Sequence, residues 1–170
     1  MSAARTALFA KLDALGIATT THEHAAVFTV AESDALHREL PGGHTKNLFL
    51  KDAKGALFLL VAEAHTDVPM KTLHKLLGCK RLSFGKPELL METLGVEPGS
   101  VTAFAVLNDN AGAVKIFIDA TLMGFDVINC HPLTNTATTT IQRDDLMAFL
   151  AATGHEATVV DLTGAPDRSD

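Results

Sequence analysis

The sequence contains no tryptophan or tyrosine, and only two of its 170 residues are cysteines. The aromatic part of the core must therefore come from nine phenylalanines. Cys79 and Cys130 lie far apart and form no CxxC motif, which argues against a disulfide framework. No apolar run approaches the roughly 20 residues of a membrane span. Residues 1–5 lack the apolar segment of a signal peptide. We expect a cytoplasmic protein without a membrane partner.

Composition is that of a globular protein, with 47% hydrophobic and 20% charged residues. The length fits one domain over residues 1–170, and we expect the polar end, residues 164–170, to be a frayed tail. The net charge of −6 argues against a broad nucleic-acid-binding surface, so no DNA partner is expected.

One segment departs from this acidic balance. Residues 71–86 contain no acid, and their basic residues include Lys71, Lys75, Lys80 and Arg81. Such a block is either a solvated helix face or a surface that holds a few phosphates at one end of an RNA.

Hydrophobic periodicity and turn residues predict interleaved helices and strands. The predicted helices span 6–15, 29–40, 69–77, 87–94 and 141–152. The predicted strands span 17–25, 46–50, 56–62, 81–84, 102–107, 114–119, 125–129 and 158–162. Several connections have hairpin length, so we expect an α+β (mixed α/β) fold with a mixed β-sheet core and surrounding helices.

Lys46 and Asn47 follow a Pro-Gly-Gly turn and begin an apolar strand. A lysine there could reach a ligand over the sheet edge, whereas Asn47 would face the opposite side of a regular strand. Both could serve one ligand only at an irregular strand start or from two flanking elements. The alternative is a surface lysine that discourages edge-to-edge aggregation.

The loop over residues 95–103 contains Gly99, Ser100, Val101 and Thr102. Glycine, proline and serine before a predicted strand allow backbone N–H groups to converge on a carbonyl oxygen. The alternative is an ordinary helix-to-strand turn.

His131 follows a buried-looking strand and precedes Pro132 and a tract of hydroxyl and amide side chains that includes Asn135 and Thr138. Strands that end in this way tend to present polar groups at the mouth of a pocket. The alternatives are a structural histidine and side-chain turns. Neighbouring Cys130 would point to the opposite face of the strand, so we reject a Cys130–His131 catalytic pair.

A metal site is weakly indicated. His22 and His24 would share one face of a strand, and His44, His65 or His131 could join them. Glu63 and Asp67 flank His65, but no serine lies in a nucleophile-elbow context. There is no P-loop and no GxGxxG motif. The sequence therefore predicts no cofactor and no bound metal.

Three stretches, taken in order, resemble the YbaK/prolyl-tRNA-synthetase-associated editing family: residues 45–50, 95–109 and 127–140. The resemblance is greatest to freestanding members that remove alanine from tRNA(Pro). It implies a mixed-sheet hydrolase that binds the acceptor end of tRNA(Pro), with prolyl-tRNA synthetase as a further candidate partner. It assigns catalytic roles to Lys46, Asn47, Gly99 and His131. Candidate walls that admit alanine and refuse proline are Phe28, Val30, Leu48 and Leu133.

One residue departs from the family pattern. The family's Gly-x-x-x-Pro motif aligns with residues 99–103, where Ala103 replaces the proline. This difference leaves other substrates open, namely cysteine, serine or threonine on a tRNA. It also leaves open an inactive module that binds tRNA or the synthetase. A metal hydrolase is a third alternative, and it would lose activity with chelators.

Overall fold

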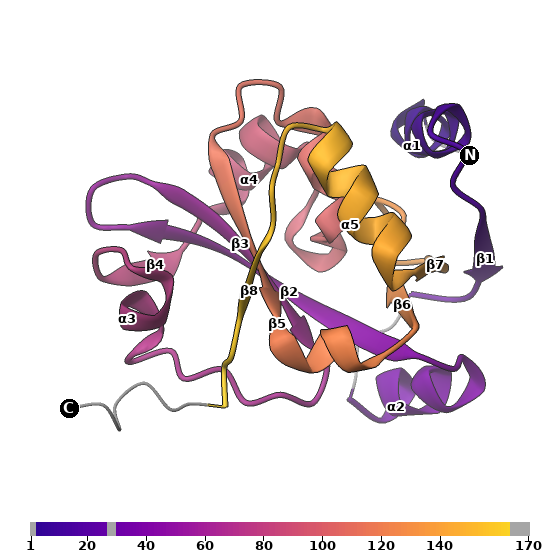
Figure 1. The fold of residues 1–170 in the computed structure, drawn as a ribbon, viewed down its shortest axis with the longest axis horizontal. Coiled ribbons are helices and arrows are strands. Elements are labelled where there is room, and N and C mark those ends of the chain that lie inside the picture. The colour runs from indigo at the N-terminus through magenta and orange to yellow at the C-terminus, as the bar shows by residue number, and fades with distance from the viewer. Residues whose placement is uncertain (1–2, 27–29, 164–170) are drawn as a thin grey trace.

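A computed structural model describes residues 3–26 and 30–163, with the side chain of Val30 left out. Its strands form one mixed sheet with helices on both faces (Figure 1). The strands are β1 (Thr19–Glu23), β2 (Gly43–Asp52), β3 (Leu57–Glu63), β4 (Leu82–Phe84), β5 (Val114–Asp119), β6 (Val127–Cys130), β7 (Ala137–Gln142) and β8 (Thr158–Val160). The α-helices are α1 (Ala3–Ala14), α2 (Val30–Glu39), α3 (Leu73–Leu77), α4 (Pro87–Leu94) and α5 (Arg143–Ala152).

Strand β2 joins two halves of the sheet. The order is β1-β7-β6-β2-β3-β5-β8, and β4 also pairs with β2. Only Gly43 and His44 of β2 pair with β6, in parallel. Residues 45–51 pair with β3, antiparallel, and residues 50–52 pair with β4. The middle of β2 therefore has β3 on one side and lies between the ends of β6 and β4 on the other.

The two faces of the sheet bury separate apolar clusters. The larger cluster contains residues of α1, α4 and α5 together with Phe49, Leu59 and Val61 of the sheet. The smaller one packs Leu73 and Leu77 of α3 against the other face. Side chains alternate along a strand, so each face receives every second residue of β2 and β3.

The turn before β2 depends on glycine. Gly42 has a φ of +103°, and a Cβ atom there would lie 2.7 Å from the carbonyl oxygen of Val127. Only a residue without a side chain lets β2 come this close to β6 in that backbone conformation.

The mixed α/β fold predicted from the sequence is confirmed. The hairpin of β2 and β3 is present, and α4 begins at Pro87 as predicted. Helix α3 is shorter than the predicted 69–77, although Gly78 ends it in a left-handed conformation. Thr29, the first residue of the predicted helix 29–40, and the tail 164–170 lie outside the described residues.

Two predictions were wrong. Residues 102–107 do not form a strand: a 3-10 helix, η2 (Ala103–Asn108), begins after Thr102, whose hydroxyl accepts a hydrogen bond from the Phe104 amide. A short apolar run is compatible with a buried helix as well as a strand. The second error is β7, for which the sequence analysis predicted no strand and whose last two residues it placed in the helix 141–152. In the part of the chain described, no helix is long and apolar enough to cross a membrane.

Candidate active site

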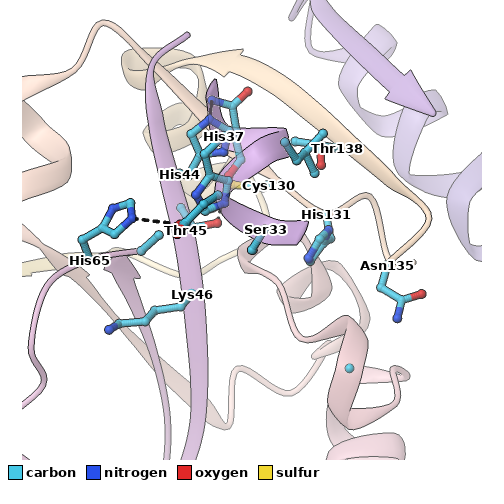
Figure 2. Close-up of a pocket in the computed structure, with 15 residues that line it drawn as sticks. Ser33, His37, His44, Thr45, Lys46, His65, Cys130, His131, Asn135 and Thr138 are labelled. Carbon is cyan, nitrogen blue, oxygen red and sulfur yellow. Dashed lines mark hydrogen bonds and ion pairs between the residues drawn. The ribbon is translucent and has the colours of Figure 1, made fainter. Parts of the chain in front are cut away.

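A cavity of about 380 Å³ opens at the start of β2, where β2 separates from β6 and faces α2. The residues that line it come from both halves of the sheet, from α2 and from two loops (Figure 2). They are Ser33, Asp34, Leu36, His37, His44, Thr45, Lys46, Ala64, His65, Gly99, Asn129, Cys130, His131, Asn135 and Thr138.

The cavity brings together residues that the sequence analysis selected from distant parts of the chain. Lys46, Gly99, His131, Asn135 and Thr138 all line it. Six other predicted residues are absent from the lining: Asn47, Leu48, Ser100, Val101, Thr102 and Leu133. Leu48 packs against the smaller core cluster and Leu133 against the larger. Phe28 and the side chain of Val30 lie outside the described residues.

Lys46 and Asn47 point to opposite faces of β2, as a regular strand requires. Lys46 lies opposite Ala62 and Asn47 opposite Val61 in the β2–β3 ladder. Asn47 is half-buried, and its Oδ1 atom is buried without a hydrogen-bond partner among the described residues. A buried amide oxygen of this kind is unusual in a folded protein.

His131 lies just after β6, and its ring is held by the backbone of β7. Nδ1 is 3.1 Å from the carbonyl oxygen of Ala137, so Nδ1 carries the proton and donates it. In that tautomer Nε2 is a hydrogen-bond acceptor. Burial lowers the pKa of His131, which favours the neutral ring at physiological pH. Leu133 has a φ of +66°, a left-handed turn that reverses the chain between His131 and Asn135.

Gly99 lies in a short 3-10 helix, η1 (Pro98–Ser100), which lines the cavity beside Asn135. The Ser100 amide donates to the Glu97 carbonyl oxygen at 2.8 Å and is therefore committed to this turn. Ala103, which stands in place of the family's proline, is fully buried as the first residue of η2. Proline is common at the first position of a helix, so both residues suit this place.

Two neighbours of the cavity have structural roles. Burial raises the pKa of the Cys130 thiol to about 12, which removes it as a nucleophile. Asn129 is 2% exposed and ties the halves of the sheet together. Its Nδ2 donates to the carbonyl oxygens of Pro41 and Gly43 at 3.0 and 3.2 Å. The main-chain carbonyl oxygen of Asn129 accepts a hydrogen bond from the Thr45 hydroxyl at 2.8 Å.

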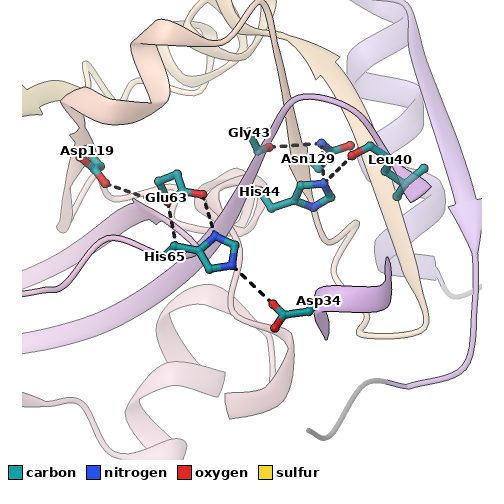
Figure 3. A network of polar contacts seen from close by, with 8 residues as sticks. All are labelled: Asp34, Leu40, Gly43, His44, Glu63, His65, Asp119 and Asn129. Atoms are coloured by element: carbon teal, nitrogen blue, oxygen red, sulfur yellow. Dashed lines mark hydrogen bonds and ion pairs between the residues drawn. The ribbon is translucent and has the colours of Figure 1, made fainter. Parts of the chain in front are cut away.

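The sequence analysis missed a cluster of imidazoles and carboxylates at one side of the cavity. His37 stacks on His44 with ring centroids 4.0 Å apart, and burial together with His44 and His65 lowers the pKa of His37 to about 4. Hydrogen bonds to the carboxylates of Glu63 and Asp34 raise the pKa of His65 (Figure 3). The spacing of Asp34 and His37, one helical turn apart, was the available signal.

The metal-ligand set around His22 and His24, weighed as an alternative in the sequence analysis, does not assemble among the described residues. These two rings stack with centroids 6.1 Å apart and line a second, smaller cavity with Glu32 and Glu39. In the residues that the structure describes, the group able to ligate a metal is a different one, Asp34, His37 and His65.

The basic block lies away from the cavity. Lys71, Lys75, Lys80 and Arg81 are all exposed, on or near α3 and β4. Because β4 pairs with the far end of β2 at Asp52, Lys80 and Arg81 lie roughly 20 Å along the strand from Lys46. A ligand that touched both places would have to extend along the molecule.

A polar cavity with a lysine, a neutral imidazole and a thiol that is not ionised defines a class of protein. It suits a hydrolase that positions an ester already activated toward water, and it does not suit a thiol enzyme. Comparison with known sequences agrees with this class. Residues 24–149 match the family model described as the aminoacyl-tRNA editing domain.

Curated relatives cover most of the chain. The prolyl-tRNA editing protein ProX of Acetoanaerobium sticklandii is 36% identical over 94% of this chain and 98% of its own length. The prolyl-tRNA synthetase associated domain-containing protein 1 of Danio rerio is 38% identical over 88% of this chain and 82% of its own. A solved structure of a candidate trans-editing enzyme for prolyl tRNA synthetase has the same fold, with a TM-score of 0.71, 20% identity and coverage of 95% and 98%.

The chain belongs to the family of aminoacyl-tRNA editing domains. The resemblance found in the sequence is therefore confirmed, and so is the class of enzyme, a hydrolase that edits mischarged tRNA. The names of its relatives connect this group of proteins with prolyl-tRNA synthetase.

Proposed function

We propose that the protein hydrolyses alanine from mischarged tRNA(Pro) and binds the acceptor end of that tRNA in the cavity. The observation that carries the proposal is the shared cavity of Lys46, Gly99 and His131, which three separate segments of the chain supply. Their order in the sequence matches the family pattern, and the relative ProX is named as a prolyl-tRNA editing protein.

The reaction needs little more than positioning and charge stabilisation. Water adds to the ester carbonyl carbon, the bond from that carbon to the ribose oxygen breaks, and this oxygen leaves with a proton. The products are free alanine and tRNA. Because Nε2 of His131 is an acceptor, it can take a hydrogen bond from the attacking water or from the substrate ammonium group. Lys46 can stabilise the negative charge that develops on the carbonyl oxygen.

The editing reaction is useful because it can select the amino acid on the tRNA by size. A synthetase site built for proline cannot strongly exclude a smaller amino acid, because each missing methylene is worth only about 1–3 kcal/mol. A separate hydrolytic site, such as the cavity that Lys46 lines, can admit alanine and refuse proline. The apolar side chains that line the cavity are those of Leu36 and Ala64 together with Cys130.

The decisive experiment compares five substrates under single-turnover conditions: alanyl-, prolyl-, cysteinyl-, seryl- and threonyl-tRNA(Pro). We expect rapid hydrolysis of the alanyl ester with the prolyl ester spared. Hydrolysis that favours cysteine, serine or threonine esters would assign a sibling specificity. Tight binding of tRNA(Pro) with no hydrolysis above background would identify an inactive binding module.

Substitution of Gly99 with alanine tests the wall formed by η1. A Cβ atom at Gly99 would meet only Asn135 Nδ2, at 3.5 Å, and the backbone there is not left-handed. The fold should therefore tolerate the methyl group, while overpacking of the bound alanyl group by about 1–3 kcal/mol lowers kcat/KM roughly 5- to 150-fold. Gly124→Ala, where a Cβ meets nothing within 4 Å, is the control. Equal rates for both variants would contradict a role for this wall.

The basic block is proposed to hold phosphates of the acceptor stem. The double variant Lys80→Glu/Arg81→Glu should raise KM for alanyl-tRNA(Pro) with little change in kcat. It should also reduce the slope of log affinity against log salt by about 1 for each lost contact. Lys115→Glu, an exposed charge change on β5, is the control. If KM and the salt slope stay unchanged, the block is only a solvated surface.

The tautomer of His131 predicts a pH dependence. Burial lowers its pKa below the ordinary 6.5, so Nε2 remains an acceptor until the pH falls below that value. We expect kcat/KM to be constant at neutral pH and to decline on the acid side with a midpoint below 6.5. His131→Gln should have lower activity and lack this acid limb. An acid limb that persists in the variant would assign the titration to another group.

A further inference from the structure

The ring of His65 lies between two carboxylates at the edge of the cavity. Its Nδ1 is 3.3 Å from Glu63 Oε2, and its Nε2 is 3.4 Å from Asp34 Oδ1 (Figure 3). A neutral imidazole carries one N–H, so only one of these nitrogens can donate to its carboxylate. The other contact becomes favourable when a second proton or a metal ion lies between the ring nitrogen and its carboxylate.

His37 adds a third ligand from the same side as Asp34. The two residues lie one turn apart on α2, which places them on one face of the helix. The ligand atoms of Asp34, His37 and His65 all lie within 4.8 Å of one another. In a tetrahedral zinc site with bonds of about 2.0–2.1 Å, neighbouring ligand atoms are about 3.3 Å apart. The Asp34–His65 contact already has this length, and a side-chain rotation of His37 would close the set.

Glu63 supplies the support that metal-bound histidines usually have. One of its oxygens, Oε1, accepts the His65 amide at 2.9 Å, while Oε2 contacts Nδ1 of the ring. Its own amide donates to the buried carboxylate of Asp119 at 2.9 Å. A carboxylate on one imidazole nitrogen fixes the tautomer and leaves the other nitrogen for the metal. Two imidazoles and one carboxylate favour zinc-like ions over magnesium or calcium.

The position of the cluster gives a bound metal a structural consequence. None of residues 31–39 of α2 is fully buried, so apolar packing holds this helix weakly. Asp34 and His37 belong to α2, whereas His65 follows β3. A metal bridging them would fasten α2 over the cavity that Lys46 lines.

We propose that Asp34, His37 and His65 bind one divalent ion of the zinc class and that this ion fastens α2 to the end of β3. The site stands apart from the proposed deacylation, because none of its three ligands is assigned a step in that reaction. It also differs from the set around His22 and His24 that the sequence suggested.

The test measures binding and stability of the full chain, without an activity assay. After treatment with EDTA and removal of the chelator, the protein is titrated with ZnCl2 by calorimetry and with CoCl2 by visible absorption. We expect one ion per chain and the intense absorption of tetrahedral cobalt. At free zinc about 100-fold above Kd, the Tm should rise by roughly 5–10 °C.

Three variants assign the binding to this site. Asp34→Asn, His37→Gln and His65→Gln should keep the metal-free Tm of the wild type and lose the zinc-dependent rise, while His74→Gln on α3 should retain it. Asp34→Asn and His65→Gln alter exposed or half-exposed side chains, so they remain informative if His37→Gln folds poorly. Absence of stoichiometric binding, or equal binding by all four variants, would overturn the proposal.

Discussion

Replacing Lys46 with alanine is expected to lower kcat/KM for alanyl-tRNA(Pro) about 100- to 1000-fold. The lysine lines the cavity from the middle of β2, where it can reach the developing negative charge of the ester. Loss of one preorganised donor to such a charge typically costs about 2.7–4 kcal/mol of transition-state stabilisation. Single-turnover hydrolysis with enzyme in excess measures this effect without interference from product release.

The fold of this variant should be unchanged, because β2 pairs with β3 through backbone groups at Lys46 and Ala62. Lys51→Ala is a matched control, since Lys51 lies on the same strand but outside the cavity lining. Lys46→Arg adds a second comparison, because it keeps the positive charge and changes its shape. Wild-type rates for Lys46→Ala would remove the lysine from the mechanism.

Replacing Asp109 with alanine is expected to destabilise the protein by about 3–5 kcal/mol, because it leaves buried donors without their partner. Asp109 is 5% exposed, and its carboxylate accepts from the amides of Ala113 and Val114 at 3.1 and 2.8 Å. Its Oδ2 also lies 2.8 Å from His155 Nε2. The carboxylate therefore joins the end of η2, the start of β5 and the segment after α5.

The stability that this carboxylate contributes depends on pH in a defined direction. Burial alone would raise the pKa of Asp109, but the hydrogen bonds from His155, Val114 and Ala113 outweigh it and lower the pKa. A carboxyl whose folded pKa is depressed stabilises the fold above its unfolded pKa of about 3.9, and this contribution is lost as the pH falls through the folded pKa. Urea unfolding of wild type, Asp109→Ala and the exposed control Asp13→Ala would measure both effects. A change for Asp109→Ala no larger than that for Asp13→Ala would contradict this role.

Asp109, His155 and Thr153 also illustrate why catalytic patterns need a cavity. The Thr153 hydroxyl lies 3.0 Å from His155 Nδ1, so the three side chains form a carboxylate–imidazole–hydroxyl chain. The hydroxyl donates to the Leu150 carbonyl oxygen, and His155 is 4% exposed. No substrate could reach this chain, which therefore stabilises the fold.

Sequence patterns predicted the cavity residues best where the immediate neighbours in the sequence indicate that a strand begins or ends. The glycine turn before Lys46 and the histidine before Pro132 both mark places where a strand begins or ends at the cavity. The roles themselves remain predictions. Alternation along β2 also indicated that Lys46 and Asn47 would diverge, and in the structure only Lys46 reaches the cavity.

The features that the sequence did not reveal depend on tertiary contacts. The Thr-rich β7 is a strand because β1 and β6 pair with its two edges, which no local pattern encodes. Residues 103–108 form a 3-10 helix because the fold buries the whole apolar run and Thr102 caps it. The cluster of His37, His44 and His65 assembles from three elements, so the helical spacing of Asp34 and His37 was its one local signal.

The junction between the two halves of the sheet, where β2 pairs with β6, has a mechanical consequence. Two residue pairs join β2 to β6, and Asn129 and Thr45 reinforce them. His131 extends from one side of this junction and Lys46 from the other, so any splaying of the halves would pull the two groups apart. A bound ligand that contacts both groups would hold the two halves of the sheet together. The lifetime of this closed arrangement would then depend on the ligand as much as on the protein.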